Sequence, residues 1–228
     1  FRLNSLDDAA ARDLIAKGIL ADPPPKAVLA LHGWPGVGAG AVASRPGPMM
    51  AAADMFRITI KGRGAHGSMP EKSIDPILIG ARIVDALQCI PGHRIAAVEP
   101  VVLSVGRFHG GSQVNAIPET ATVEGTVRYL KPAIGQQAAE HLERLVKGTC
   151  LAMGAGYELD YRRDYPPTHN YPALVARART LVMETFGAGS WFDLPSPSMG
   201  SEDFSYFLQQ APGAMFRLDM GKNSPSLH

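Results

Sequence analysis

The strongest constraint on the fold of this chain is the order of hydrophobic patterns between residues 55 and 165. Apolar and polar residues alternate in MFRITIKG (55–62), which predicts a half-buried strand. In SIDPILIGARIVDALQCI (73–90) the apolar residues recur every three or four positions, which predicts an amphipathic helix. Two strand patterns, a second helix pattern and a last strand pattern follow, at 100–108, 120–130, 133–154 and 157–165.

This β-α-β-β-α-β order is typical of a ferredoxin-like unit, in which both helices cover one face of a four-stranded antiparallel sheet. Residues 1–52 and 166–228 contain further helix and strand patterns and flank the unit. We therefore predict an α/β protein in which the compact unit at 53–165 is inserted into a second domain. Gly and Pro dominate residues 33–50, so we expect little regular structure there.

Charge and hydropathy exclude several classes of protein. The formal net charge is only +1, so we predict no nucleic-acid partner and no binding to an acidic membrane surface. No apolar run reaches the roughly 18 residues that span a bilayer, and no signal peptide is visible. The two cysteines, Cys89 and Cys150, are predicted to be buried thiols in a reducing compartment, and we expect a cytoplasmic protein.

Three polar residues stand at the ends of predicted elements in the inserted unit: His66 in GRGAHGSMP, Asn115 in HGGSQVNAIPE and Arg128 in EGTVRY. Glycines beside them let the backbone bend sharply and approach a ligand. Arg128 can bind a carboxylate through two parallel N–H bonds, and His66 or Asn115 can donate to a developing oxyanion. The same pattern also fits a structural role, in which Asn115 fixes a turn and Arg128 is a surface strand residue.

His32 ends a predicted buried strand, KAVLALH (26–32), and precedes the Gly/Pro-rich segment. Strand ends at the mouth of an α/β sheet are where ligands gather. A zinc or manganese centre needs about three or four protein donors, however, so His32 and the distant His228 do not define one by themselves. The sequence contains no H-E-x-x-H motif, no paired cysteines and no G-x-S-x-G elbow.

Five ordered motifs together resemble those of the amidohydrolase branch of the two-metal aminoacylase and carboxypeptidase family. They are ALHGWPG, RPGPMMAAADMFRITIKGRGAHGSMP, FHGGSQVNAIPETATVEGTVR, MGSEDFSYF and the terminal LH, and the resemblance covers nearly the whole chain. The branch includes hippurate hydrolases, N-acyl-amino-acid amidohydrolases and plant auxin-conjugate hydrolases. The resemblance implies a catalytic α/β domain, of which 1–52 and 166–228 are parts, and an inserted lid or dimerisation domain at 53–165.

The resemblance also implies roles for individual residues around a substrate. His66 matches a lid histidine that, in a homodimer, reaches the active site of the neighbouring subunit and steadies the tetrahedral intermediate. Asn115 and Arg128 match lid residues that bind the backbone and the carboxylate of the substrate. Gly200 and Ser201 belong to the GSED segment that lines the substrate pocket.

For the metals, the resemblance implies that His32 and His228 are ligands of two divalent ions, zinc or manganese. The family's Cys/His ligand motif, its Glu-Glu segment with the general base, and its last strand and helix are not in this sequence. We therefore predict a chain truncated at both ends that binds metal poorly alone. Our first hypothesis is metal-dependent hydrolysis of N-acyl amino acids to an acid and an amino acid. The alternative is a non-catalytic dimerisation or binding module derived from the same fold.

Overall fold

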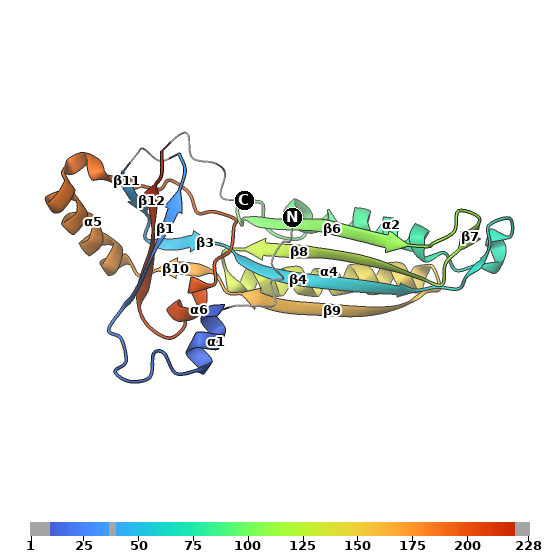
Figure 1. Ribbon diagram of the computed structural model, residues 1–228. Helices are drawn as coiled ribbons and strands as arrows, with labels where there is room; N and C mark the ends of the chain where they lie inside the picture. The colour runs from blue at the N-terminus through green and yellow to red at the C-terminus, as the bar shows by residue number, and fades with distance from the viewer. Residues whose placement is uncertain (1–9, 37–39, 222–228) are drawn as a thin grey trace. The chain divides into compact units, whose positions relative to one another are not determined.

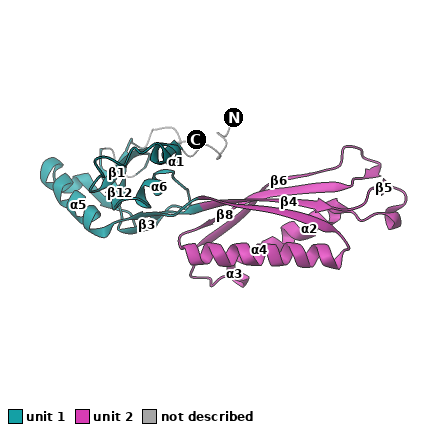
Figure 2. Ribbon diagram, turned by 90° about the horizontal axis from the view of Figure 1, so that it is seen from below, with its two compact units in different colours: residues 1–52, 165–228 teal, residues 53–164 magenta. Residues whose placement is uncertain are grey.

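The computed structural model describes residues 10–36 and 40–221 (Figure 1). The chain divides into two compact units, of which unit 2 comprises residues 53–164 and unit 1 comprises residues 1–52 together with 165–228 (Figure 2). Each unit has its own sheet or sheets and its own buried apolar residues.

Unit 2 is built on a four-stranded sheet with the order β6-β8-β4-β9. Its strands are β4 (Ala52–Lys61), β6 (Val101–Gly110), β8 (Thr120–Tyr129) and β9 (Gly156–Tyr165). The long helices α2 (Pro76–Leu87) and α4 (Pro132–Ala152) both lie on one face of this sheet (Figure 2). The predicted ferredoxin-like arrangement is therefore confirmed.

The local sequence explains how these elements form and pack. Asp75 caps α2, because its Oδ1 accepts hydrogen bonds from the amides of Ile77 and Leu78, and Pro76 suits the first turn. The apolar stripes of both helices face the sheet, where they meet the alternating apolar residues of β4. The residues buried in this core include Phe56, Ile58, Ile60, Ile79, Ile83, Leu87, Ala138, Leu142 and Val146.

Unit 1 contains a second four-stranded sheet, with the order β1-β12-β2-β11. Its strands are β1 (Val28–Trp34), β2 (Val42–Ser44), β11 (Trp191–Asp193) and β12 (Gly213–Asp219). Helix α5 (Pro172–Phe186) packs Val175 against Trp191 and Phe216 of this sheet. Helices α1 (Ala10–Ala16) and α6 (Phe204–Leu208) lie next to each other in the same unit.

The prediction that residues 33–50 lack regular structure is wrong. This segment contains the end of β1, the whole of β2, and β3 (Gly47–Met50), which pairs antiparallel with β10 (Thr168–Asn170). Both short strands find their partners far along the chain, since β2 also pairs with β11 and β12. Local composition carries no signal of such long-range pairing.

Both cysteines are free thiols, as expected, but Cys89 is exposed and only Cys150 is buried. None of the helices in the described ranges combines the length and apolar character needed to cross a bilayer.

A buried carboxylate joins three strands of unit 2. Asp54 of β4 is 1% exposed and accepts hydrogen bonds from the hydroxyls of Tyr129 on β8, at 3.0 Å, and Tyr161 on β9, at 2.8 Å. Burial raises the pKa of Asp54, and the two tyrosine hydroxyls oppose this effect. Burial, followed by the nearby charge of Asp54, likewise raises the pKa of each tyrosine. The network holds together the two strands, β4 and β9, through which the chain enters and leaves the unit.

We expect Tyr161→Phe to lower the free energy of unfolding of the chain by about 1–3 kcal/mol, because a buried carboxylate loses one of its two donors. Urea unfolding followed by circular dichroism measures this. Tyr157→Phe is the matched control, since Tyr157 lies on the same strand and is not a partner of Asp54. An equal loss in both variants would contradict a specific role for the Asp54 network.

The raised pKa of Asp54 also predicts a pH dependence. A carboxyl whose pKa is higher in the folded chain than its ordinary value of 3.8 stabilises the fold at low pH, and loses this contribution as the pH rises through the folded value. The difference in unfolding free energy between the wild type and Asp54→Asn is therefore expected to shrink as the pH rises from 4 towards 7. Unfolding curves across this pH range test the direction of the change. The difference would instead grow with pH if folding lowered the pKa of Asp54.

Candidate functional site

His32 lies on the edge strand β1 of unit 1, with its ring in a defined orientation. Its Nδ1 lies 2.7 Å from the carbonyl oxygen of Gly33. Because a carbonyl only accepts, Nδ1 carries the proton and Nε2 has the free lone pair. The ring of His32 also meets the ring of Trp34 edge-on, with centroids 5.7 Å apart.

Two acidic residues, Glu202 and Asp203, follow Gly200 and Ser201 in the segment before α6, and Glu202 approaches His32. Glu202 Oε2 lies 4.0 Å from His32 Nε2. Burial and the adjacent charge of Asp203 raise the pKa of Glu202, while His32 opposes the shift. Asp203 Oδ2 accepts a hydrogen bond of 3.1 Å from the amide of Ala11, which ties this segment to the first turn of α1.

The arrangement of His32 fits a metal ligand. Metal-binding histidines usually donate their second ring N–H to a carbonyl or carboxylate, as His32 does to Gly33. Across the ranges 10–36 and 40–221, no three His, Cys, Asp or Glu side chains gather into a metal-binding group. His228 lies outside the described residues. The described residues thus supply one suitable imidazole, with one carboxylate beside it, and not a complete centre.

The structure brings His66 and Asn115 together at one end of unit 2. The two-residue strands β5 (Ala65–His66) and β7 (Ala116–Ile117) pair antiparallel, with His66 opposite Ala116. The amide of Gly67 donates a hydrogen bond of 2.8 Å to the carbonyl oxygen of Asn115. A β-carbon on Gly67 would lie 2.9 Å from that oxygen, so glycine is needed for this close approach.

The hydrogen bonds of His66 define its tautomer. The backbone amide of Ser68 donates to His66 Nδ1 at 3.2 Å, and the Ser68 hydroxyl lies 2.8 Å from the same atom. Because a backbone amide only donates, Nδ1 is the acceptor, and the proton of the neutral ring is on Nε2. The ring is exposed, so this N–H is available to an incoming oxygen.

Arg128 lies near the other end of the same sheet. It is half-buried on β8 and stands opposite Val102 of β6, whereas the β8 end next to Asn115 begins at Thr120. Eight residue steps along a strand span about 26 Å. Unit 2 therefore does not bring Arg128 to His66 and Asn115 within a single copy.

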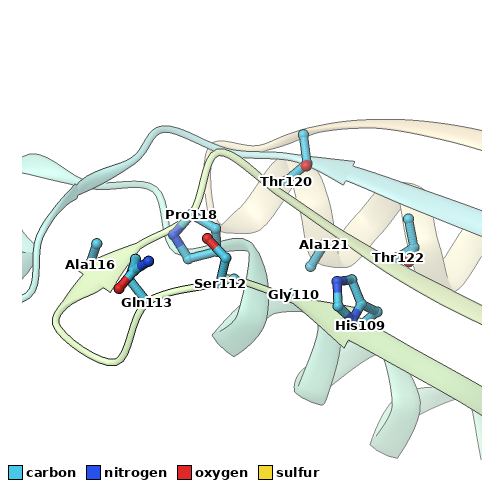
Figure 3. Close-up of a pocket in the computed structure, with 10 residues that line it drawn as sticks. His109, Gly110, Ser112, Gln113, Ala116, Pro118, Thr120, Ala121 and Thr122 are labelled. Carbon is cyan, nitrogen blue, oxygen red and sulfur yellow. The ribbon is translucent and has the colours of Figure 1, made fainter.

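A cavity of about 310 Å³ opens beside the Asn115 loop (Figure 3). His109, Ser112 and Gln113 line it from the end of β6 and the following loop, and Thr120 and Thr122 line it from β8. These side chains offer hydroxyl, amide and imidazole groups, so the cavity suits polar rather than purely apolar groups.

Sequence reasoning identified His32 and His66 but missed the residues that orient them. Glu202, Trp34 and Ser68 all lie inside motifs that were recognised, and this proximity along the chain was the available signal. Their contacts depend on the rotation of each ring and on the path of the segment before α6, and no spacing rule provides these.

Comparison with known proteins matches this chain to peptidases and to a deacetylase. A family model described as a peptidase dimerisation domain matches residues 52–152. The chain is 38% identical to thermostable carboxypeptidase 1 of Saccharolobus solfataricus, over 78% of this chain and 45% of that protein. It is 32% identical to the N-acetylcysteine deacetylase of Bacillus subtilis, over 94% of this chain and 55% of that protein.

The structural comparison agrees with these matches. A Bacillus subtilis protein described as a dinuclear metal-binding peptidase from the M20 family superposes with a TM-score of 0.77 at 26% identity. The match covers 97% of this chain and 55% of that chain. The chain thus spans about half the length of the curated relatives it matches.

We expect Gly67→Ala to separate β5 from β7 and to lower the unfolding free energy by about 1–3 kcal/mol, because backbone atoms of Asn115 must give way. Gly106→Ala is the control, since a β-carbon there would meet no atom within 4 Å. Hydrogen exchange at the amide of residue 67 should accelerate in the first variant alone. Unchanged exchange there would contradict the proposed packing of His66 beside Asn115.

Proposed function

We propose, from the premise that the chain belongs to the M20 family of peptidases and amidohydrolases, that it acts in metal-dependent hydrolysis of N-acyl amino acids. The products are an acid and an amino acid. The observation that carries this proposal is the pair of oriented imidazoles, His32 with a free Nε2 lone pair and His66 with an exposed Nε2–H. Two divalent ions, zinc or manganese, would supply an activated water when bound.

In this proposal His32 holds one of the metals through Nε2, and Gly33 fixes its tautomer. Glu202 lies 4.0 Å from the same nitrogen, so it can accept a hydrogen bond from a group bound next to His32. Gly200 and Ser201 precede Glu202 and would line the substrate pocket. His228 would be a further ligand, from outside the described residues.

His66 would donate its Nε2–H to the oxygen of the amide as that oxygen gains negative charge. Asn115 would bind the backbone of the substrate beside it. Arg128 would bind the carboxylate of the amino acid part through its planar guanidinium. Because Arg128 lies about 26 Å along β8 from Thr120, at the end of the strand next to Asn115, Arg128 and His66 are assigned to one substrate only if they come from two subunits.

This requirement supports a homodimer formed through unit 2. Its sheet ends in two edge strands, β6 and β9. Charged side chains protect edges from pairing, and β9 contains five of them, at Glu158, Asp160, Arg162, Arg163 and Asp164. Strand β6 contains only Arg107 and exposes Val102 and Phe108, so we assign the dimer contact to β6.

The second candidate function is a non-catalytic dimerisation or binding module. It is favoured by the donor set of the described residues, since His32 and Glu202 are too few for a dinuclear centre, while the peptidase dimerisation model matches residues 52–152. Metal analysis of the native protein together with a hydrolysis assay on N-acyl amino acids separates the two candidates. The cytoplasmic location expected from the sequence stays a prediction.

We expect His66→Ala in the native protein to lower kcat on a benzoyl-glycine-type amide by about 10²–10³-fold with little change in KM, because a donor to the oxyanion is lost. His93→Ala, at an exposed residue that ends helix α3 (Ile90–His93), is the control and should leave kcat unchanged. Steady-state kinetics measure both. An unaltered kcat in the His66 variant would refute its assigned role.

Light scattering coupled to size-exclusion chromatography should give the mass of a dimer for the chain. The double variant Val102→Lys with Ser104→Lys should shift it towards monomer, because charges on β6 oppose edge-to-edge pairing. Glu158→Lys on β9 serves as the comparison and should stay dimeric. A dimer that survives the β6 changes but not the β9 change would move the interface to the other edge.

A further inference from the structure

Arg217 of β12 is a buried arginine that pairs with no acidic side chain in the described part of the chain. Arg217 is 6% exposed. Its Nε and Nη2 atoms have no hydrogen-bond partner among the residues that the structure describes. Burial lowers its pKa. Burying an unpaired guanidinium is costly, so its place in this sheet calls for an explanation.

The guanidinium of Arg217 stacks on Trp34. Its central carbon lies 3.7 Å from the centre of the Trp34 ring, a contact that is worth about 2 kcal/mol where water is excluded. Trp34 also packs against the buried cluster of Met49, Met50 and Met215. The indole of Trp34 is therefore held by two contacts, one with the guanidinium of Arg217 and one with the methionine cluster.

Trp34 in turn contacts His32. The two rings meet edge-on, at an interplanar angle of 64°. The parallel pairing of β1 with β12 places His32 directly beside Arg217 and Trp34 beside Asp219. Imidazole, indole and guanidinium thus form a continuous series of contacts across two neighbouring strands.

A single hydrogen bond from Nδ1 to Gly33 leaves the imidazole free to tilt about that bond. The edge of Trp34 limits this tilt, and Arg217 limits the motion of Trp34. We propose that Arg217 is a positioning residue, which acts through Trp34 to fix the ring of His32 in the orientation that presents Nε2. The inference rests on the proposed function only in taking His32 as a metal ligand.

Arg45 provides a matched comparison within unit 1. Its Nε and Nη1 atoms are also buried without a hydrogen-bond partner in the described part of the chain, and none of the recorded cation–ring contacts involves it. Arg45 is half-buried as a residue, but a purely structural effect of removing an arginine with buried, unpartnered nitrogens should appear at both positions. An effect on His32 should appear only at Arg217.

The experiment uses the chain with isotope-labelled histidine and records the ring carbon–proton signals by NMR. His32→Gln assigns the His32 signal by its loss. Because the Trp34 ring current acts on His32, Arg217→Met should move or broaden that signal, Arg217→Lys should have a smaller effect, and Arg45→Met should leave it in place. Circular dichroism checks that each variant is folded.

An unmoved His32 signal in folded Arg217→Met, or an equal shift in Arg45→Met, overturns the inference. If Arg217→Met does not fold, the comparison of Arg217→Lys with Arg45→Lys decides. A shift of the His32 signal in Arg217→Lys but not in Arg45→Lys supports the inference, and any other result overturns it.

Titration with Zn²⁺ alone separates this inference from the proposed function. Zn²⁺ should perturb His32 in the native wild-type protein, and Arg217→Met should weaken this binding about tenfold, as loss of a supporting residue does. If Zn²⁺ leaves the His32 signal of the wild type unperturbed, the metal-ligand role of His32 fails. The positioning role of Arg217 is then judged from the His32 shifts measured without metal. If the shifts without metal are absent, the positioning fails and the metal role stands.

Discussion

The length of strand β8 is the constraint on which the account of this protein depends. Thr120 begins β8 next to the Asn115 loop, and Arg128 stands one residue before its end. A strand is stiff and rises about 3.3 Å per residue, so the two ends of unit 2 cannot serve one small substrate in the same copy. In the proposed function, groups at the two ends of this sheet act on one substrate only when two copies pair.

Local packing prepares each group for that role before any ligand arrives. The β5–β7 ladder holds His66 opposite Ala116, and Ser68 fixes its tautomer. In unit 1, Gly33 and Trp34 fix His32 in the same way. In both cases a residue close by in the sequence determines which ring nitrogen carries the proton. The histidine and the residue that orients it therefore belong to one short segment. The buried Asp54 network adds rigidity where β4, β8 and β9 meet.

Much of unit 2 was predictable, because its elements are long and carry a clear period. Alternation in β4 and the three- to four-residue spacing in α2 and α4 follow from which face each element buries. Strands β2 and β3 were not predictable, since each is short and lies in a Gly- and Pro-rich segment, and their partners lie far along the chain. The stack of Arg217 on Trp34 was invisible for the same reason.

The sequence motifs proposed a set of site residues, which stays a prediction, and did not give their arrangement. The sequence motifs named His66, Asn115 and Arg128 together, but the pairing of β5 with β7 places only the first two at one end of unit 2, and Arg128 lies about 26 Å along β8 from Thr120 at that end. That separation follows from the length of β8 between Thr120 and Arg128.

Mixing two inactive variants of the native protein tests the shared site most directly. His66→Ala and Arg128→Met are purified separately, dissociated, mixed in equal amounts and allowed to re-pair. If one substrate uses His66 of one subunit and Arg128 of the other, the mixture should regain about a quarter of wild-type activity, since half of the dimers are mixed and each of these has one intact site of two. Proven subunit exchange with no recovery of hydrolysis would contradict the account.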